Sequence, residues 1–178
     1  MMNENEIRET CQTNPERGFR MLVDHFQSTI YWHIRRMVVS HEDAEDVLQE
    51  TFIKVYRYLD DFRAESSLST WMYRIATNEC VRFLNRRKEQ AVSTEEVQAE
   101  LMNKLMASDY VDYDNAMEVK FQQALLKLPE KQRLVFNLRY YDELKYEEIS
   151  RITDTKVETL KANYHFAKEK IKEYMINN

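Results

Sequence analysis

The chain has 178 residues and a net charge of −5, with 32% charged and 43% hydrophobic residues. It contains one glycine and two prolines, so residues that interrupt helices are rare and an all-α fold of one or two domains is expected. The amino-terminal residues are polar and acidic, and no run of 18 apolar residues occurs. We therefore expect no signal peptide and no membrane insertion.

Nothing in the sequence favours enzyme chemistry. Cys11 and Cys80 are isolated from one another, which suits the reducing cytoplasm, where we expect this protein to act. The four histidines are scattered, and a chain with one glycine has no glycine-rich loop to hold a phosphate. We therefore expect no catalytic activity, no bound metal and no cofactor.

Three helices are expected in the first half of the chain. The first runs from Pro15 to about Val39, with proline at its preferred first position. Ser40 caps the second, whose first turn carries the acidic residues that a helix dipole favours. A polar loop at 63–67 precedes a third helix at about 68–87. We expect that helix to bury four side chains, Met72, Ile75, Ala76 and Phe83.

The middle of the chain is acidic. Residues 88–120 carry three basic and eight acidic side chains, a net charge of −5. Residues 94–106 have a modest tendency to form a short helix, and another helix is expected at about 115–128. The pattern predicts two small helical domains, residues 1–90 and 115–178, joined by an acidic linker at 91–114.

The carboxy-terminal domain has the pattern of a helix-turn-helix. Apolar spacing predicts helices at about 129–141 and 146–152, with a left-handed turn at Asp154. Thr155 and Glu158 are spaced as a capping box for the last helix. One stripe of that helix is expected to be buried, namely Leu160, Tyr164, Ala167 and Ile171. A second stripe is expected to face a ligand, namely Lys161, Ala162, His165 and Lys168. The pattern fits a DNA-binding unit, but it also fits an ordinary helical hairpin with a basic surface.

Three motifs in one order carry a more specific signal. Asp43–Val55, Ser69–Asn78 and Leu128–Arg133, followed by the helix-turn-helix, resemble bacterial RNA polymerase sigma factors of the extracytoplasmic-function (ECF) type. The resemblance implies a factor that binds core RNA polymerase, directs it to specific promoters and promotes DNA melting for transcription initiation. Core polymerase and promoter DNA would be its partners, and the family also allows an anti-sigma factor. The alternatives are a helix-turn-helix regulator that acts on duplex DNA without core polymerase, and a structural helical adaptor.

The resemblance assigns polymerase binding to the second helix. In the family, the helix with this motif docks on a coiled coil of the largest polymerase subunit. Asp46, Gln49 and Glu50 are spaced i, i+3 and i+4, so their side chains share one helix face. Without the resemblance, the same residues would be read as a solvated acidic stripe.

The third helix resembles the family element that opens and reads the −10 promoter element. Arg74, Asn78 and Arg82 share a face, where arginine can neutralise phosphates and asparagine can bond a base edge. Family members capture an unstacked base, for which Trp71 is either a stacking surface or simply a core residue. The residues expected at the −10 element are Arg63, Trp71, Arg74, Asn78, Arg82, Arg86 and Arg87.

The tail resembles the family's −35-reading domain. The residues expected at the −35 element are Lys156, Lys161, Ala162, His165, Phe166 and Lys168. Glu158 stands where the family often has glycine, and Phe166 stands where it often has arginine. Arginine makes the commonest specific contact to guanine, so we expect a −35 preference different from that of relatives that keep it.

The resemblance also implies a distance that the linker between the two domains must span. The family's two promoter elements lie about 17 base pairs apart, or roughly 58 Å along the duplex. A flexible linker of about 24 residues spans only about 25–30 Å on average, but about 80 Å when fully extended. We therefore expect the linker to be drawn out when both domains bind DNA.

Overall fold

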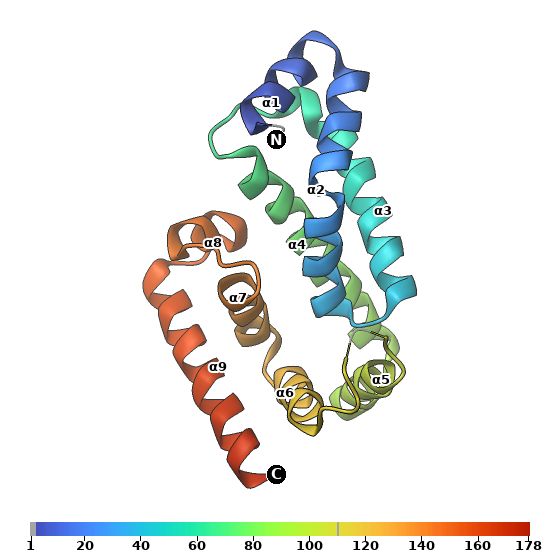
Figure 1. Ribbon diagram of the computed structural model, residues 1–178, viewed down its shortest axis with the longest axis vertical. Coiled ribbons are helices and arrows are strands. Elements are labelled where there is room, and N and C mark those ends of the chain that lie inside the picture. The colour runs from blue at the N-terminus through green and yellow to red at the C-terminus, as the bar shows by residue number, and fades with distance from the viewer. Residues whose placement is uncertain (1–2, 110) are drawn as a thin grey trace.

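The computed structural model describes residues 3–109 and 111–178 (Figure 1). Over these residues the chain forms nine α-helices and one 3-10 helix and has no strand, which confirms the all-α prediction. None of these helices is long and apolar enough to cross a membrane. In chain order the elements are α1 (Glu4–Thr13), α2 (Pro15–Val38), α3 (His41–Tyr58), η1 (Leu59–Asp61), α4 (Leu68–Gln90), α5 (Thr94–Met106), α6 (Ala116–Leu126), α7 (Glu130–Tyr140), α8 (Tyr146–Thr153) and α9 (Val157–Asn177).

Helix α1 is the element that the sequence did not predict. It packs against α2, and its start is capped by Asn3, whose side chain accepts a hydrogen bond from a backbone N–H at 3.1 Å. Only Ile7 and Cys11 of this helix are buried, and its other residues are charged or polar. Two buried positions are too few to produce a periodic signal.

Helices α2, α3 and α4 begin at the predicted residues because each has a polar N-cap. The side chains of Asn14, Ser40 and Ser67 each accept a hydrogen bond from a first-turn backbone N–H, at 3.1, 3.3 and 3.0 Å respectively. The three helices pack against one another to form the amino-terminal bundle.

Helix α4 is covered on two sides, by α2 and α3 and by α8. Met72 and Ala76 are buried as predicted, whereas Ile75 and Phe83 are only half-buried, so that part of the prediction was wrong. A helix that is enclosed on two sides does not show a single apolar stripe, and polar residues share its interior. Its further buried residues are Leu68, Thr70, Tyr73, Thr77, Glu79, Cys80 and Leu84.

Helix α5 lies within the acidic segment, over the residues with the predicted short-helix tendency. Ser93 caps it, accepting from the Glu96 N–H at 3.1 Å. Gln98 donates to the backbone carbonyl of Leu126 at 2.8 Å, which joins α5 to α6. A small apolar cluster completes the contact, formed by Val39, Leu105, Val111 and Leu126. The segment is therefore folded against its neighbours, and its predicted limits as a linker stay a prediction.

Helices α7, α8 and α9 form the helix-turn-helix. Asp154 has φ 54° and ψ 38°, which confirms the left-handed turn. The predicted capping box of Thr155 and Glu158 is wrong, because α9 begins at Val157 and its N-cap, Lys156, makes no side-chain cap. Thr155 lies one residue too early, and its hydroxyl donates to the Thr153 carbonyl at 3.2 Å.

The amino-terminal bundle and the helix-turn-helix share one apolar core. Leu138, Ile149 and Leu160 belong to the same buried cluster as Ile34 and Met72. Figure 1 shows α7 and α8 beside the bundle and α9 on the outer side, and α9 packs on α6, α7 and α8. This arrangement leaves one long face of α9 open to solvent.

Candidate functional site

The three residues predicted to bind polymerase lie together on the surface of α3. Asp46, Gln49 and Glu50 are exposed, while Val47 on the same helix is buried and holds α3 against the core. They line a groove of about 370 Å³ between α3 and α4. The opposite wall of this groove is α4, with Phe83, Arg86, Arg87 and Gln90.

Arg86 and Arg87, which the sequence assigned to the −10 element, thus lie beside the acidic α3 face. Arg87 is paired within the chain, with Asp43 at 3.1 Å and with Glu100 at 2.8 Å. Lys104 contacts the same two carboxylates, at 2.6 and 3.0 Å. Asp43, Arg87, Glu100 and Lys104 therefore form a closed ring of charges, which we call the ionic ring, and it ties α3, α4 and α5 together.

A buried carboxylate also links α4 to α3. Glu79 is only 4% exposed and forms ion pairs with Lys54 of α3 and with Arg82 of α4. Arg82 remains exposed despite this ion pair, and Arg74 and Asn78 are exposed as well. Sequence reasoning missed Glu79, although its i, i+3 spacing to Arg82 was a usable signal.

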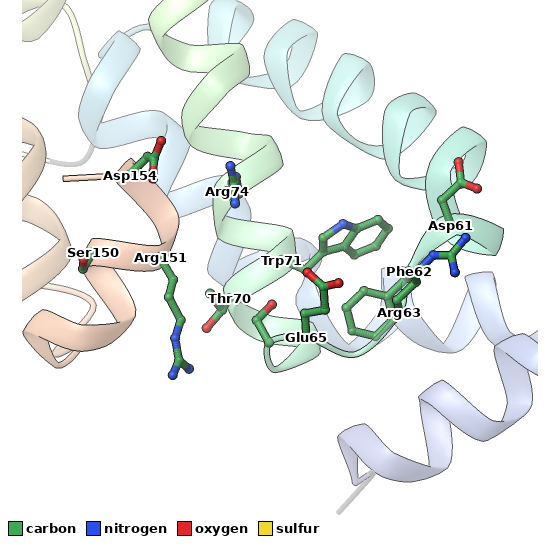
Figure 2. A pocket seen from close by; sticks show the side chains of 11 residues that line it. Asp61, Phe62, Arg63, Glu65, Thr70, Trp71, Arg74, Ser150, Arg151 and Asp154 are labelled. Carbon is green, nitrogen blue, oxygen red and sulfur yellow. The ribbon is translucent and has the colours of Figure 1, made fainter. Parts of the chain in front are cut away.

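A second cavity, of about 510 Å³, lies between α4 and α8 (Figure 2). Three of the predicted −10 residues, Arg63, Trp71 and Arg74, line it, and Asn78 does not. Trp71 is half-buried, and its ring lies 5.0 Å from that of Phe62, tilted by 42°. Trp71 therefore packs on the core and also lines the cavity, and its role as a stacking surface stays a prediction.

The other wall of this cavity belongs to the helix-turn-helix. Figure 2 shows Ser150, Arg151 and Asp154 across from Trp71 and Arg74. These residues lie roughly 80 positions later in the chain than their counterparts in α4. The sequence carried no signal that the two segments would meet.

The predicted −35 residues lie at the N-cap and on the open face of α9. Lys156, Lys161, Ala162, His165, Phe166 and Lys168 are all exposed. Leu160, Ala167 and Ile171 are buried, as the two-stripe pattern predicted, whereas Tyr164 is only half-buried. Phe166 is 53% exposed.

Tyrosine rings support two of the lysines on α9. The ammonium of Lys168 lies 4.9 Å from the centre of the Tyr164 ring, and that of Lys161 lies 5.9 Å from the Tyr146 ring. Arg139 approaches Tyr146 as well, at 5.1 Å. Burial raises the pKa of the Tyr164 phenol further above its ordinary value of 10.0, at which the ring is already uncharged at neutral pH. Tyr146 and Arg139 were not among the predicted site residues.

Within the parts of the chain that the structure describes, no group of three or more His, Cys, Asp or Glu side chains is placed to hold a metal ion. The two cavities instead present guanidinium, carboxylate and aromatic groups on open surfaces. Such groups suit recognition of a charged macromolecule.

Comparison with known proteins assigns both halves of the chain. The model of Sigma-70 region 2 matches residues 22–90, and that of Sigma-70 region 4 matches residues 118–171. The chain is also 31% identical to the ECF RNA polymerase sigma factor SigW of Bacillus subtilis, over 98% of this chain and 97% of SigW. The chain belongs to the ECF sigma factors.

Other ECF sigma factors show the same level of similarity. The ECF RNA polymerase sigma-E factor of Escherichia coli K12 is 33% identical over 92% of this chain and 89% of its own length. As an ECF sigma factor, the protein binds core RNA polymerase and directs it to promoters for transcription initiation. A regulator that acts on duplex DNA without polymerase is not favoured.

Two solved structures have the same fold. CnrH in complex with the cytosolic domain of CnrY superposes with a TM-score of 0.69 at 19% identity, covering 97% of this chain and 96% of CnrH. The sigma factor RpoE in complex with the anti-sigma factor NepR from Bartonella quintana gives 0.68 at 20% identity, covering 90% and 98%. The overall helical arrangement is therefore shared at low sequence identity.

Proposed function

We propose that this ECF sigma factor divides its work among three surfaces. The exposed α3 face binds core polymerase, the α4 face with its cavity binds the −10 element, and the open face of α9 reads the −35 element. The corresponding domains are residues 1–90 and 115–178, with residues 91–114 as the linker. The observation that carries this proposal is the separation of an exposed acidic face on α3 from an exposed basic face on α9.

The α3 surface suits a basic protein partner. Asp46 and Glu50 are exposed, so they keep their charges in water and steer a positively charged surface toward the helix. Gln49 between them adds both a hydrogen-bond donor and an acceptor. The adjacent groove gives this surface a concave edge, where a partner side chain can be received.

The α4 surface suits a strand with an extruded base. Arg74, Asn78 and Arg82 form an exposed row, in which the two arginines can neutralise phosphates and the asparagine can bond a base edge. Trp71 presents a half-buried ring beside Phe62, and stacking on such a ring returns about 1–3 kcal/mol per base. That gain offsets much of the few kcal/mol that extrusion costs. Arg87 contributes only when phosphate replaces its carboxylate partners in the ionic ring.

The α9 surface suits a major groove with an altered base preference. Lys161, His165 and Lys168 supply donors to phosphates and base edges, and Ala162 leaves space for close approach. Phe166 offers an apolar contact, which favours a thymine methyl group over the guanine that an arginine would bind. We therefore propose a −35 sequence with less guanine at the base that faces Phe166.

An anti-sigma protein is a further proposed partner. The solved structures of RpoE and CnrH contain NepR and the cytosolic domain of CnrY, and this chain shares their fold. A partner of that kind would act on the free protein and compete with core polymerase for it. We also propose that the protein acts in the cytoplasm, where polymerase and promoter DNA are found.

A core-polymerase binding assay tests the α3 assignment. The double variant Gln49→Ala with Glu50→Arg is expected to weaken binding at least tenfold, because it removes a hydrogen-bonding group and reverses a charge. A matched control, Gln12→Ala with Glu9→Arg, makes the same two changes at exposed positions of α1. Equal binding by both variants and the natural protein would remove α3 from the polymerase interface.

A further inference from the structure

Asp142 is a buried carboxylate at the contact between the two halves of the molecule. It lies in the turn between α7 and α8, and its side chain is only 5% exposed. An isolated buried carboxylate is costly, so this position calls for partners of opposite charge or with hydrogen-bond donors.

The partners of Asp142 come from the amino-terminal bundle. One carboxylate oxygen lies 3.5 Å from Nδ1 of His33, and the other lies 3.4 Å from Nη1 of Arg36, both in α2. Tyr73 of α4 is next to them, with its ring 5.2 Å from that of His33. Burial and the charge of Asp142 raise the pKa of the Tyr73 phenol, which stays protonated. Asp142 is therefore a contact of the helix-turn-helix with two helices of the bundle.

The side chains of the bundle that contact Asp142 are themselves held in place. His33 is fully buried, and its Nε2 lies 2.9 Å from the Thr77 hydroxyl in α4. The guanidinium of Arg36 stacks 4.4 Å above the ring of Tyr141, the residue before Asp142. Side chains fixed in this way lose little further entropy when they meet the carboxylate, which favours a single geometry.

This contact determines which element forms the second wall of the cavity beside Trp71. Helix α8 begins four residues after Asp142, and its Ser150 and Arg151, with Asp154 of the following turn, form the second wall of the cavity. A nucleic-acid strand that enters beside Trp71 and Arg74 must share that space with α8 (Figure 2).

We propose that Asp142 is a latch that holds the helix-turn-helix against the bundle and keeps α8 as one wall of the cavity of Arg63, Trp71 and Arg74, where it limits the space for a nucleic-acid strand. Apolar packing of Leu134, Leu138 and Ile149 supplies adhesion, and the buried carboxylate favours the docking geometry that places it beside Arg36 and His33. The latch rests on the contacts alone. Its effect on promoter strands rests on the proposed −10 role of the cavity.

Charge reversal at the latch is the direct test. Asp142→Lys places a cation between His33 and Arg36, so the two halves are expected to separate. Small-angle X-ray scattering should then show a larger radius of gyration and maximum dimension, with the helical circular dichroism unchanged. Glu143→Lys is the matched control, because it makes the same charge change at the next, exposed residue of the same turn.

A swapped pair separates the latch from general damage. Arg36→Glu combined with Asp142→Lys restores opposite charges across the contact and should return the scattering toward that of the natural protein. The proposal is overturned if Asp142→Lys stays folded and as compact as the natural protein, or if Glu143→Lys expands equally. If Asp142→Lys alone loses its helical signal, a compact, folded swap variant supports the latch, and an unfolded one overturns it.

Binding of a single-stranded oligonucleotide separates the latch from the proposed −10 site. Affinity for a site that is open only part of the time is reduced by the open fraction, so Asp142→Lys should bind several-fold more tightly than Glu143→Lys. If Asp142→Lys expands in scattering without this gain in affinity, the latch proposal is supported, but the result counts against the cavity as the −10 site. If the two variants scatter equally, the latch proposal is wrong, whatever their affinities.

Discussion

The backbone of Cys11 in α1 lies directly against Gly18 in α2. A Cβ atom added to Gly18 would stand 2.5 Å from both the Cα and the N of Cys11, closer than non-bonded atoms approach. The only glycine of the chain is therefore the crossing point of two helices. Its small size lets α1 pack on α2 and bury Ile7.

Replacing this glycine should destabilise the protein, although it lies within a helix. Glycine to alanine in a helix normally stabilises by about 0.5–1 kcal/mol, whereas overpacking against a backbone costs about 1–3 kcal/mol. We expect Gly18→Ala to lower the free energy of unfolding in urea by about 1–2 kcal/mol. Ser28→Ala, at an exposed position of the same helix, is the control and should not be destabilising.

Stability should fall in mildly alkaline solution. Cys80 is fully buried, and burial raises the pKa of its thiol far above the ordinary value of 9.0. The native state thus keeps a proton that the unfolded chain releases, so its stabilisation is complete below pH 9 and is lost as the pH rises further. Above that pH the loss approaches about 1.4 kcal/mol per pH unit for this group. Urea unfolding of Cys80→Ala should show a shallower decline between pH 9 and 10, and an equal slope would contradict the thiol assignment.

Loss of basic groups from α9 should weaken −35 binding and leave core binding intact. Lys161→Ala combined with His165→Ala is expected to reduce promoter affinity of the holoenzyme roughly tenfold and to lower its salt dependence. Lys172→Ala, exposed two to three turns later on the same helix, is the control. Fluorescence anisotropy with labelled promoter DNA at several salt concentrations measures both quantities. A matching drop in core-polymerase binding would show that α9 does not act separately.

Phe166 is the position at which base preference should be adjustable. Phe166→Arg adds a two-pronged donor where an apolar ring now stands, so transcripts from promoters with guanine at the facing base should increase about tenfold or more. Phe166→Leu keeps an apolar contact without that donor and should retain the original preference. Run-off transcription on a library with a randomised −35 element compares the three proteins. The same base preference in all three proteins would show that Phe166 does not contact a base.

Local chemistry explains which structural features could be predicted. The starts of α2, α3 and α4 follow from their polar caps, and Asp154 adopts the left-handed turn that its short polar side chain tolerates. The prediction for Thr155 was wrong because a capping pair in the sequence does not fix where the helix starts. Helix α9 starts two residues after Thr155. Helix α1 stayed hidden because its stability comes from the close crossing at Gly18 rather than from a periodic apolar face.

The candidate site likewise has features that local sequence predicts and features that it does not. Exposure of Asp46, Gln49 and Glu50, and of the α9 residues, follows from helical periodicity within one element. The cavity between α4 and α8 and the pairing of Arg87 with Asp43 and Glu100 join segments far apart in the sequence. Such contacts depend on how the elements pack, and a single sequence does not encode them in any local pattern.

The ionic ring has a consequence for how far the two halves of this protein can move apart. While Asp43 and Glu100 hold Arg87 and Lys104, α5 stays on the bundle, and only the nine residues between Met106 and Ala116 are left to extend. Fully stretched, those residues reach about 30 Å, against about 80 Å for the whole acidic segment. All four side chains retain some exposure, so dissolved ions weaken their attraction. The effective length of the tether is thus governed by four charges, and rising ionic strength should lengthen it.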